Sequence, residues 1–197
     1  MTNPLAFRPA ARLALLVASI ALLPGCMQKT VPWEPIDGRY DSGNWFGARF
    51  ALDLPKDWIM LNFVENGLVA TRDGFNLQTI KVRKIKFGED LPHTKKKVGK
   101  AMVPQELSEV LLDDLRTDPT VNALKVLETK PATISGKKGF RTTVAFKDGH
   151  GLRHKAVLCG VVAEDRAWQI TYVAPVRHYF DRDLPAFDAA LASLKIW

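Results

Sequence analysis

Residues 140–173, FRTTVAFKDGHGLRHKAVLCGVVAEDRAWQITYV, decide the fold of this 197-residue chain. The stretch contains three strand-like runs separated by two turn signals. The runs are 140–146, 152–162 and the segment around Trp168, Ile170 and Tyr172, and the turns are 147–150 and 164–165. Strands joined by turns this short predict an antiparallel meander.

The middle of this stretch is apolar at both alternating sets of positions. Residues 156–162, AVLCGVV, have no polar side chain apart from the thiol of Cys159. Such a strand is typical of the centre of a sheet, where both faces are covered. We therefore place this strand centrally and expect Cys159 to be a buried, unreactive thiol.

One helix is predicted before the meander and one after it. Pro104 suits the first turn of a helix because it lacks an N–H that this turn would leave unpaired. Apolar residues then follow at helical spacing, namely Leu107, Val110, Leu111 and Leu115. A second helix is expected to begin near Asp183, a good N-cap residue. Its apolar face comprises Leu184, Phe187, Leu191 and Leu194.

Strand patterns also precede the first helix, at 50–54, 59–64, 68–72 and 77–87. In the last of these the parity of the apolar residues changes, which predicts a β-bulge near Arg83 and Lys84. The order strands, helix, strands, helix, with hairpin turns throughout, predicts an α+β fold. We expect an antiparallel sheet of about six or more strands packed with two main helices, in a single domain at 46–197.

Three features of this pattern resemble the PsbP-like domain. They are the first strand leading into Pro55-x-x-Trp58, the late meander, and a last helix that ends in Ser193-Leu194-Lys195. The resemblance covers about 46–197 and implies a layered sandwich of antiparallel sheet and helices. It also implies a non-enzymatic accessory role, in which the domain helps to assemble a membrane complex or binds a partner, and it carries over no catalytic residues.

The first 25 residues have the pattern of a signal peptide. Arg8 and Arg12 precede a stretch, 13–23, that is apolar except for Ser19. At ~1.5 Å per residue this stretch spans roughly 16 Å as a helix, about half of a ~30 Å hydrocarbon core. The pattern therefore predicts export and not a permanent transmembrane helix.

The signal ends in Leu23-Pro24-Gly25-Cys26, which resembles the lipobox of bacterial lipoproteins. The resemblance implies cleavage between Gly25 and Cys26, and covalent lipid with palmitate on Cys26 that anchors the chain stably through two or more acyl chains. Residues 26–45 are predicted to be this lipidated cysteine and a flexible tether. Met27 replaces the Asp that favours inner-membrane retention in enterobacteria-like sorting, so we expect an outer-membrane protein facing the periplasm. The alternative is an ordinary cleaved signal in which Cys26 is incidental.

The chain carries 28 Lys and Arg against 21 Asp and Glu, a net charge of +7. A basic stretch precedes the acidic first helix, and it is a candidate binding surface for an anionic lipid or an acidic envelope protein. Its residues are Lys81, Arg83, Lys84, Lys86, Lys95, Lys96, Lys97 and Lys100. The alternative is a solvated loop that pairs locally with the helix. Nucleic acid is disfavoured, because Phe87 is the only aromatic residue in the stretch and an exported protein meets little nucleic acid.

Catalytic and metal chemistry are not favoured by the sequence. His150 and His154 lie four residues apart along a strand, ~13 Å, which is too far to share one metal ion. We expect both to be solvent-facing hairpin histidines. Asp148 beside His150 would supply an acid–base pair, although Asp-Gly also has a purely conformational role in a hairpin turn. No cofactor is predicted beyond the lipid, and Cys159 alone can form no internal disulfide.

Together these patterns predict a membrane-anchored, non-enzymatic binding or accessory module for an envelope partner or complex. Two other interpretations stay open. One is an envelope enzyme that uses Asp148 and His150, and the other is a carrier of a small ligand or lipid with a pocket between sheet and helix.

Overall fold

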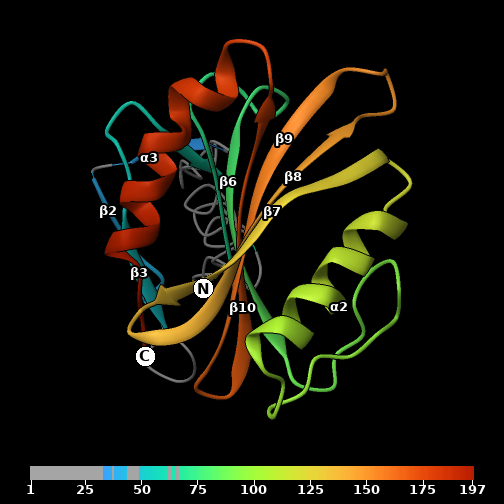
Figure 1. The fold of residues 1–197 in the computed structure, drawn as a ribbon. Coiled ribbons are helices and arrows are strands. Elements are labelled where there is room, and N and C mark those ends of the chain that lie inside the picture. The colour runs from blue at the N-terminus through green and yellow to red at the C-terminus, as the bar shows by residue number, and fades with distance from the viewer. Residues whose placement is uncertain (1–32, 37, 44–48, 62–63, 65–66) are drawn as a thin grey trace, which may run out of the picture. The chain divides into compact units, whose positions relative to one another are not determined.

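A computed structural model of the chain describes residues 33–36, 38–43, 49–61, 64 and 67–197. The strands in this part of the chain are β1 Trp33–Pro35, β2 Arg39–Asp41, β3 Phe50–Asp53, β4 Ile59–Leu61, β5 Gly67–Thr71, β6 Thr79–Lys86, β7 Asn122–Ile134, β8 Lys137–Lys147, β9 Arg153–Ala163, β10 Arg166–Pro175 and β11 Lys195–Ile196. The helices are α2 Pro104–Thr117 and α3 Tyr179–Ser193 (Figure 1).

The strands form a large and a small antiparallel sheet. The large sheet has the order β1-β4-β5-β6-β10-β9-β8-β7, and the small sheet has the order β11-β3-β2. The predicted meander is confirmed, because β8 pairs with β9 and β9 pairs with β10 through short turns. The predicted α+β class is confirmed as well, with an eight-stranded sheet and two helices.

Helices α2 and α3 cover opposite faces of the large sheet (Figure 1). The central strand β9 contributes side chains to the cores on both faces, since successive side chains of a strand point to opposite faces. Val157 and Cys159 join the cluster beneath α3, whereas Ala156 and Leu158 join the cluster beneath α2. The expected burial of this strand on both faces is thus confirmed.

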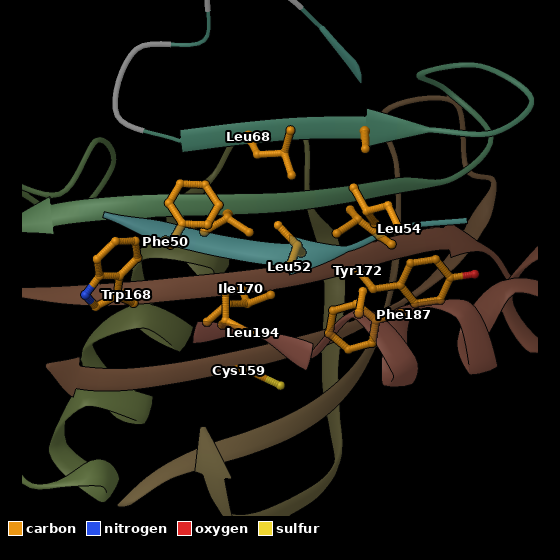
Figure 2. Packing of buried hydrophobic residues seen from close by; sticks show 14 of the residues in the cluster. Phe50, Leu52, Leu54, Leu68, Cys159, Trp168, Ile170, Tyr172, Phe187 and Leu194 are labelled. Atoms are coloured by element: carbon orange, nitrogen blue, oxygen red, sulfur yellow. The ribbon is translucent and has the colours of Figure 1, made fainter. Parts of the chain in front are cut away.

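The core on the α3 side is closed by the small sheet. Its buried side chains come from β3, β5, β9, β10 and α3 and from the residues directly after β3 and α3 (Figure 2): Phe50, Leu52, Leu54, Leu68, Cys159, Trp168, Ile170, Tyr172, Phe187 and Leu194. Two of these aromatic residues carry polar groups, and both groups have partners. The Tyr172 hydroxyl contacts the carbonyl oxygens of Tyr179 and Phe180 at 3.1 and 3.0 Å, and the Trp168 indole N–H donates to the carbonyl oxygen of Ala163 at 3.4 Å.

The core on the α2 side depends on a glycine in the central strand. Helix α2 begins at Pro104, as predicted, and inserts Leu107 against β9. A Cβ on Gly160 would lie 2.4 Å from Phe140 Cε1 and 3.3 Å from Leu107 Cδ2. Only a residue without a side chain lets the Phe140 ring lie this close to β9.

The predicted bulge in β6 is wrong. The register of β6 with β10 runs without a shift from Lys86 to Thr79. Val82 belongs to the cluster on the α3 side, and Ile85 belongs to the cluster on the α2 side. The apolar residues switch from even to odd positions because both faces of β6 are buried. A regular strand therefore explains the pattern, and no bulge is needed.

The start of the last helix was also predicted wrongly. Helix α3 begins at Tyr179, after His178 has taken a left-handed φ of 75°. Asp183 is an interior residue of α3 and is 2% exposed. Its carboxylate accepts hydrogen bonds from Arg72 and Arg182, so this acidic side chain fastens the helix to the sheet instead of capping it.

The predicted tether at 26–45 is too long at its C-terminal end. Strand β1 pairs with β4, and β2 pairs with β3, so residues from Trp33 onward contribute to the sheets. The Trp33 ring packs 6.1 Å from that of Phe75, and the Tyr40 ring packs 5.4 Å from that of Phe50. Short edge strands of three residues leave too little pattern for the sequence to reveal them.

The predicted signal peptide at 1–25 and the predicted lipid attachment site at Cys26 lie outside the described residues. Within the described ranges, no helix has both the length and the apolarity that crossing a membrane requires.

Candidate binding site

The basic stretch predicted as a binding surface is divided by the fold. Lys81 and Arg83 lie on the face of β6 that α2 covers, whereas Lys84 lies on the opposite face. Lys84 is 8% exposed, and its Nζ lies 5.3 Å from the ring centroid of Phe50 and 5.7 Å from that of Trp168. Burial lowers the pKa of Lys84 and that of Lys81. These side chains therefore do not form one continuous surface.

The lysines of the loop at 88–103 lie beside acidic residues of α2 and of the loop itself. Lys96 Nζ lies 2.6 Å from Asp113 Oδ2, and Lys97 Nζ lies 3.6 Å from Asp90 Oδ1. The hydrogen bond from Lys96 lowers the pKa of Asp113. The buried Asp114 accepts the backbone N–H groups of the loop residues at 93 and 94, at 2.8 and 3.0 Å. This is the local pairing that the sequence offered as an alternative.

Six of the eight predicted basic residues are exposed, namely Lys81, Lys86, Lys95, Lys96, Lys97 and Lys100. Two of these six, Lys96 and Lys97, lie in the ion pairs described above, so the positive charge of the loop is partly balanced by neighbouring acidic residues.

The hairpin between β8 and β9 uses its aspartate to close the turn. Asp148 Oδ1 accepts the backbone N–H groups of His150 and Leu152, each at 2.9 Å. Oδ2 lies 3.1 Å from Nε2 of His154, which donates because a carboxylate only accepts. Partial burial opposes ionisation, but these hydrogen bonds lower the pKa of Asp148. Asp148 therefore contacts His150 only through the backbone N–H of His150, and the second carboxylate oxygen of Asp148 is hydrogen-bonded to His154.

One expectation about the histidines was wrong. His154 is 8% exposed and stacks on Phe146 with the ring centroids 5.4 Å apart. It is held under the hairpin by Asp148, whereas His150 is exposed as expected. The prediction failed because Phe146 lies directly opposite His154 in the register and covers the imidazole.

Cys159 is completely buried, as predicted, and burial raises the pKa of its thiol to about 12. A thiol of this kind is not a nucleophile at neutral pH. In the part of the chain that the structure describes, no three His, Cys, Asp or Glu side chains lie close enough to hold a metal ion.

A cleft of about 690 Å³ lies between the start of α2 and strands β7 and β8. Two of its hydroxyl groups are bonded to the neighbouring Thr142, whose Oγ1 lies 3.2 Å from Ser108 Oγ and 3.1 Å from Thr129 Oγ1. Lys130 in its lining is paired with Glu128 at 3.2 Å. The cleft is thus lined by both apolar and polar side chains, and several of the polar ones are already engaged by the protein.

A second concavity collects positive charge. The cationic groove is a hollow of about 560 Å³ formed by β7, β8, β9 and the residue after β10. Its cations are Lys125, Lys147, Arg153 and Lys155, and its apolar side chains include Ala123, Leu127, Ala145 and Val176. No acidic residue lines it.

Strand register brings the four cations together. Lys125 lies opposite Ala145, which in turn lies opposite Lys155, so two cations flank one alanine across three strands. Lys147 lies directly opposite Arg153 in the next row on the same face. Like charges placed directly opposite each other destabilise a sheet. The fold therefore carries an unfavourable arrangement at this end that a bound anion would relieve.

The groove cations are not paired with any acidic side chain in the described part of the chain. Within the described ranges none of the four forms an ion pair, and Lys155 Nζ instead lies 5.2 Å from the ring centroid of Phe180. Three of the four side chains are exposed, and Lys155 is half-buried. The arrangement is suited to attract and hold an anion.

This groove could not be predicted from the sequence pattern, because its cations are spread from 125 to 155 and never form a run. In the structure Lys147 and Arg153 are equidistant from His150 at the centre of the β8–β9 turn, whereas the predicted turn at 147–150 included Lys147 itself, so the sequence pattern did not pair the two residues.

No protein-family model and no curated protein sequence matches the chain. Solved structures with the same fold include the solution structure of cyanobacterial PsbP (CyanoP) from Synechocystis sp. PCC 6803. It is 11% identical to this chain with a TM-score of 0.51, and the match covers 89% of this chain and 99% of CyanoP. The predicted PsbP-like fold is thereby confirmed.

The Saccharomyces cerevisiae Ran-binding protein Mog1p is also similar, at 12% identity and a TM-score of 0.50, over 74% of this chain and 88% of Mog1p. A protein from Bacteroides thetaiotaomicron matches at 14% identity with a TM-score of 0.47. That match covers 74% of this chain and only 44% of the Bacteroides protein. At such identities the likeness concerns the fold alone.

Proposed function

We propose that this protein is a membrane-anchored lipoprotein of the bacterial envelope whose single domain is a non-enzymatic binding or accessory module. The anchor is the lipid on Cys26, and the domain faces the periplasm from the outer membrane. The sequence ending in Gly25-Cys26, with Met27 after it, supports this anchor and location.

The observation that carries the binding role is the cationic groove. Its four cations converge from three strands without an acidic partner among the described residues, although their mutual repulsion destabilises the sheet. The similarity in fold to CyanoP and to the Ran-binding protein Mog1p is compatible with a module that acts by contact.

The enzyme alternative is not favoured by the geometry of the hairpin. A general base must reach the proton that it removes, but Asp148 accepts two backbone N–H groups and bonds to His154. His150 offers Asp148 only its backbone N–H. The hydrogen bonds of Asp148 close the hairpin turn, and this structural role explains why an aspartate is present here.

The anchor is tested by fractionation of cells that produce the Cys26→Ala variant. We expect the wild-type chain in the outer-membrane fraction and the variant outside it, because a chain without acyl groups has no stable attachment. A variant that stays in the outer membrane would refute the lipid anchor.

The binding surface is tested by in-cell crosslinking and pull-down of three forms: wild type, Lys147→Glu/Arg153→Glu, and the control Lys95→Glu/Lys100→Glu. The two variants have the same net charge and differ only in place. We expect the crosslinked partners of the wild type to be lost only in the groove variant. Loss only in the loop variant would move the contact to the basic loop, and retention in both would refute an electrostatic contact at either place.

A further inference from the structure

The cationic groove combines two kinds of surface that a simple anion would not need. Leu127 lines it and is 52% exposed, and Leu152, which precedes Arg153, is 48% exposed. Most large apolar side chains of the domain are buried, so two exposed leucines beside unpaired cations at one end of the sheet are a local exception. This end of the sheet offers both an anion site and an apolar surface.

The spacing of the cations suits one compact anion with several oxygen atoms. Neighbouring strands lie ~4.8 Å apart, and residues i and i+2 of one strand lie ~6.6 Å apart. Long Lys and Arg side chains starting from such positions can converge on one phosphate, and a guanidinium can bind it through two parallel hydrogen bonds. Lys147 and Arg153, which face each other across β8 and β9, form the centre of this arrangement.

The dimensions of the groove favour a small molecule over a protein surface. About 560 Å³ lies within the ~300–1,000 Å³ typical of small-molecule sites, whereas a protein partner usually covers ~800 Å² on each side. Ala123, Ala145 and Val176 also line the hollow, so part of its surface is apolar. The occupant should therefore have one anionic end and one apolar end.

We infer that the cationic groove binds one phosphate-bearing lipid, with its headgroup held by Lys125, Lys147, Arg153 and Lys155 and the adjoining part of an acyl chain on Leu127 and Val176. The inference rests on the proposed function in using the same contact surface, and it names the ligand of that surface. A lipid anchor on Cys26 would keep the groove close to a supply of such molecules.

The test places a photoreactive amino acid at residue 127 of the full-length protein in cells grown with radioactive phosphate. After illumination we expect a radiolabelled adduct that migrates close to the unmodified protein, and mass spectrometry of the adduct should show an acyl chain. An acyl chain on the peptide that contains residue 127 identifies the captured molecule as a lipid, whereas a radiolabelled adduct without an acyl chain would be a nucleotide or a sugar phosphate and would overturn the lipid assignment. The same probe at Val103, 49% exposed and on a different part of the surface, should give no adduct.

Charge variants show whether the groove selects the lipid. Lys147→Glu/Arg153→Glu should reduce the labelled adduct at least about tenfold, because two charge-assisted hydrogen bonds are lost. Lys95→Glu/Lys100→Glu should leave it unchanged. If the groove variant does not fold, as judged by its thermal unfolding, Lys125→Glu replaces it.

Three further results would overturn the inference. A protein-sized adduct at residue 127 would refute the lipid ligand while supporting a protein partner at the proposed surface. Equal labelling at residues 103 and 127 would show general contact with the membrane. The absence of any labelled adduct at residue 127 would show that the groove binds no phosphate-bearing lipid. Loss of the anchor in Cys26→Ala is a separate result that refutes the proposed attachment alone.

Discussion

Replacing Asp183 by alanine tests whether a single buried carboxylate fastens α3 to the sheet. Asp183 Oδ1 lies 3.1 Å from Arg72 Nη1, and Oδ2 lies 2.6 Å from Arg182 Nη2. The carboxylate is 2% exposed, and the two arginine side chains are 38% and 30% exposed. The variant therefore removes the shared acceptor of two cations at the edge of the core.

The size of the stability loss depends on which partners Arg72 and Arg182 keep in the variant. A hydrogen bond to a charged group contributes about 1.5–3 kcal/mol, so two would give about 3–6 kcal/mol. Each arginine keeps a second carboxylate, Asp57 for Arg72 and Asp73 for Arg182, and each reaches solvent. We therefore halve the sum and expect a loss of about 1.5–3 kcal/mol, which for a domain of this size lowers Tm by about 3–12 °C.

Urea unfolding followed through the fluorescence of the buried Trp58 and Trp168 measures this loss. The control is Asp181→Ala, an exposed acidic residue in the first turn of α3, which should cost no more than about 1 kcal/mol. An Asp183→Ala variant within about 0.5 kcal/mol of the wild type, or equal to Asp181→Ala, would refute the role of the buried carboxylate.

Three further outcomes are expected. Gly160→Ala should destabilise the protein by about 1–3 kcal/mol in urea unfolding, because its methyl group would meet Phe140, and Phe140→Leu should recover part of the loss. Asp73, whose pKa is lowered by the hydrogen bond from Arg182, stabilises the fold above the ordinary carboxyl pKa of about 3.9, and this contribution is lost as the pH falls through the lower folded-state pKa. Asp73→Asn should therefore reduce the fall in Tm between neutral and acidic pH, and an unchanged pH profile would contradict this assignment. Cys159 should resist a thiol reagent at pH 8 until the protein unfolds, as peptide mapping of the labelled residue will show; rapid labelling of the native protein would contradict its burial.

The elements with long, regular patterns could be predicted from the sequence. Alternation from Phe140 to Phe146 locates β8, and Pro104 followed by Leu107 and Leu111 locates the start of α2. These signals are local, since they depend on which face of one element is buried. The same reasoning predicted a bulge in β6 wrongly, because Val82 and Ile85 are buried on opposite faces of one regular strand.

Features made by distant segments could not be predicted. Asp183 looks like an N-cap from its neighbours, but its partner Arg72 is 111 positions away in the chain. Lys84 belongs to a basic run in the sequence, yet β3 and β10 place the rings of Phe50 and Trp168 over it. The cationic groove arises in the same way, since register and not sequence proximity gathers its charges.

The position of the groove within the large sheet bears on how it recognises a ligand. Three of its four cations come from β8 and β9, inner strands that are hydrogen-bonded on both sides and packed between two cores. Amide hydrogens in such strands exchange with solvent only when a large part of the domain opens. The backbone beneath the cations is therefore rigid before any ligand arrives, and only the lysine and arginine side chains must be ordered on binding. Association then requires no slow rearrangement of the chain, so on-rates should be set by electrostatic attraction and fall as salt concentration rises.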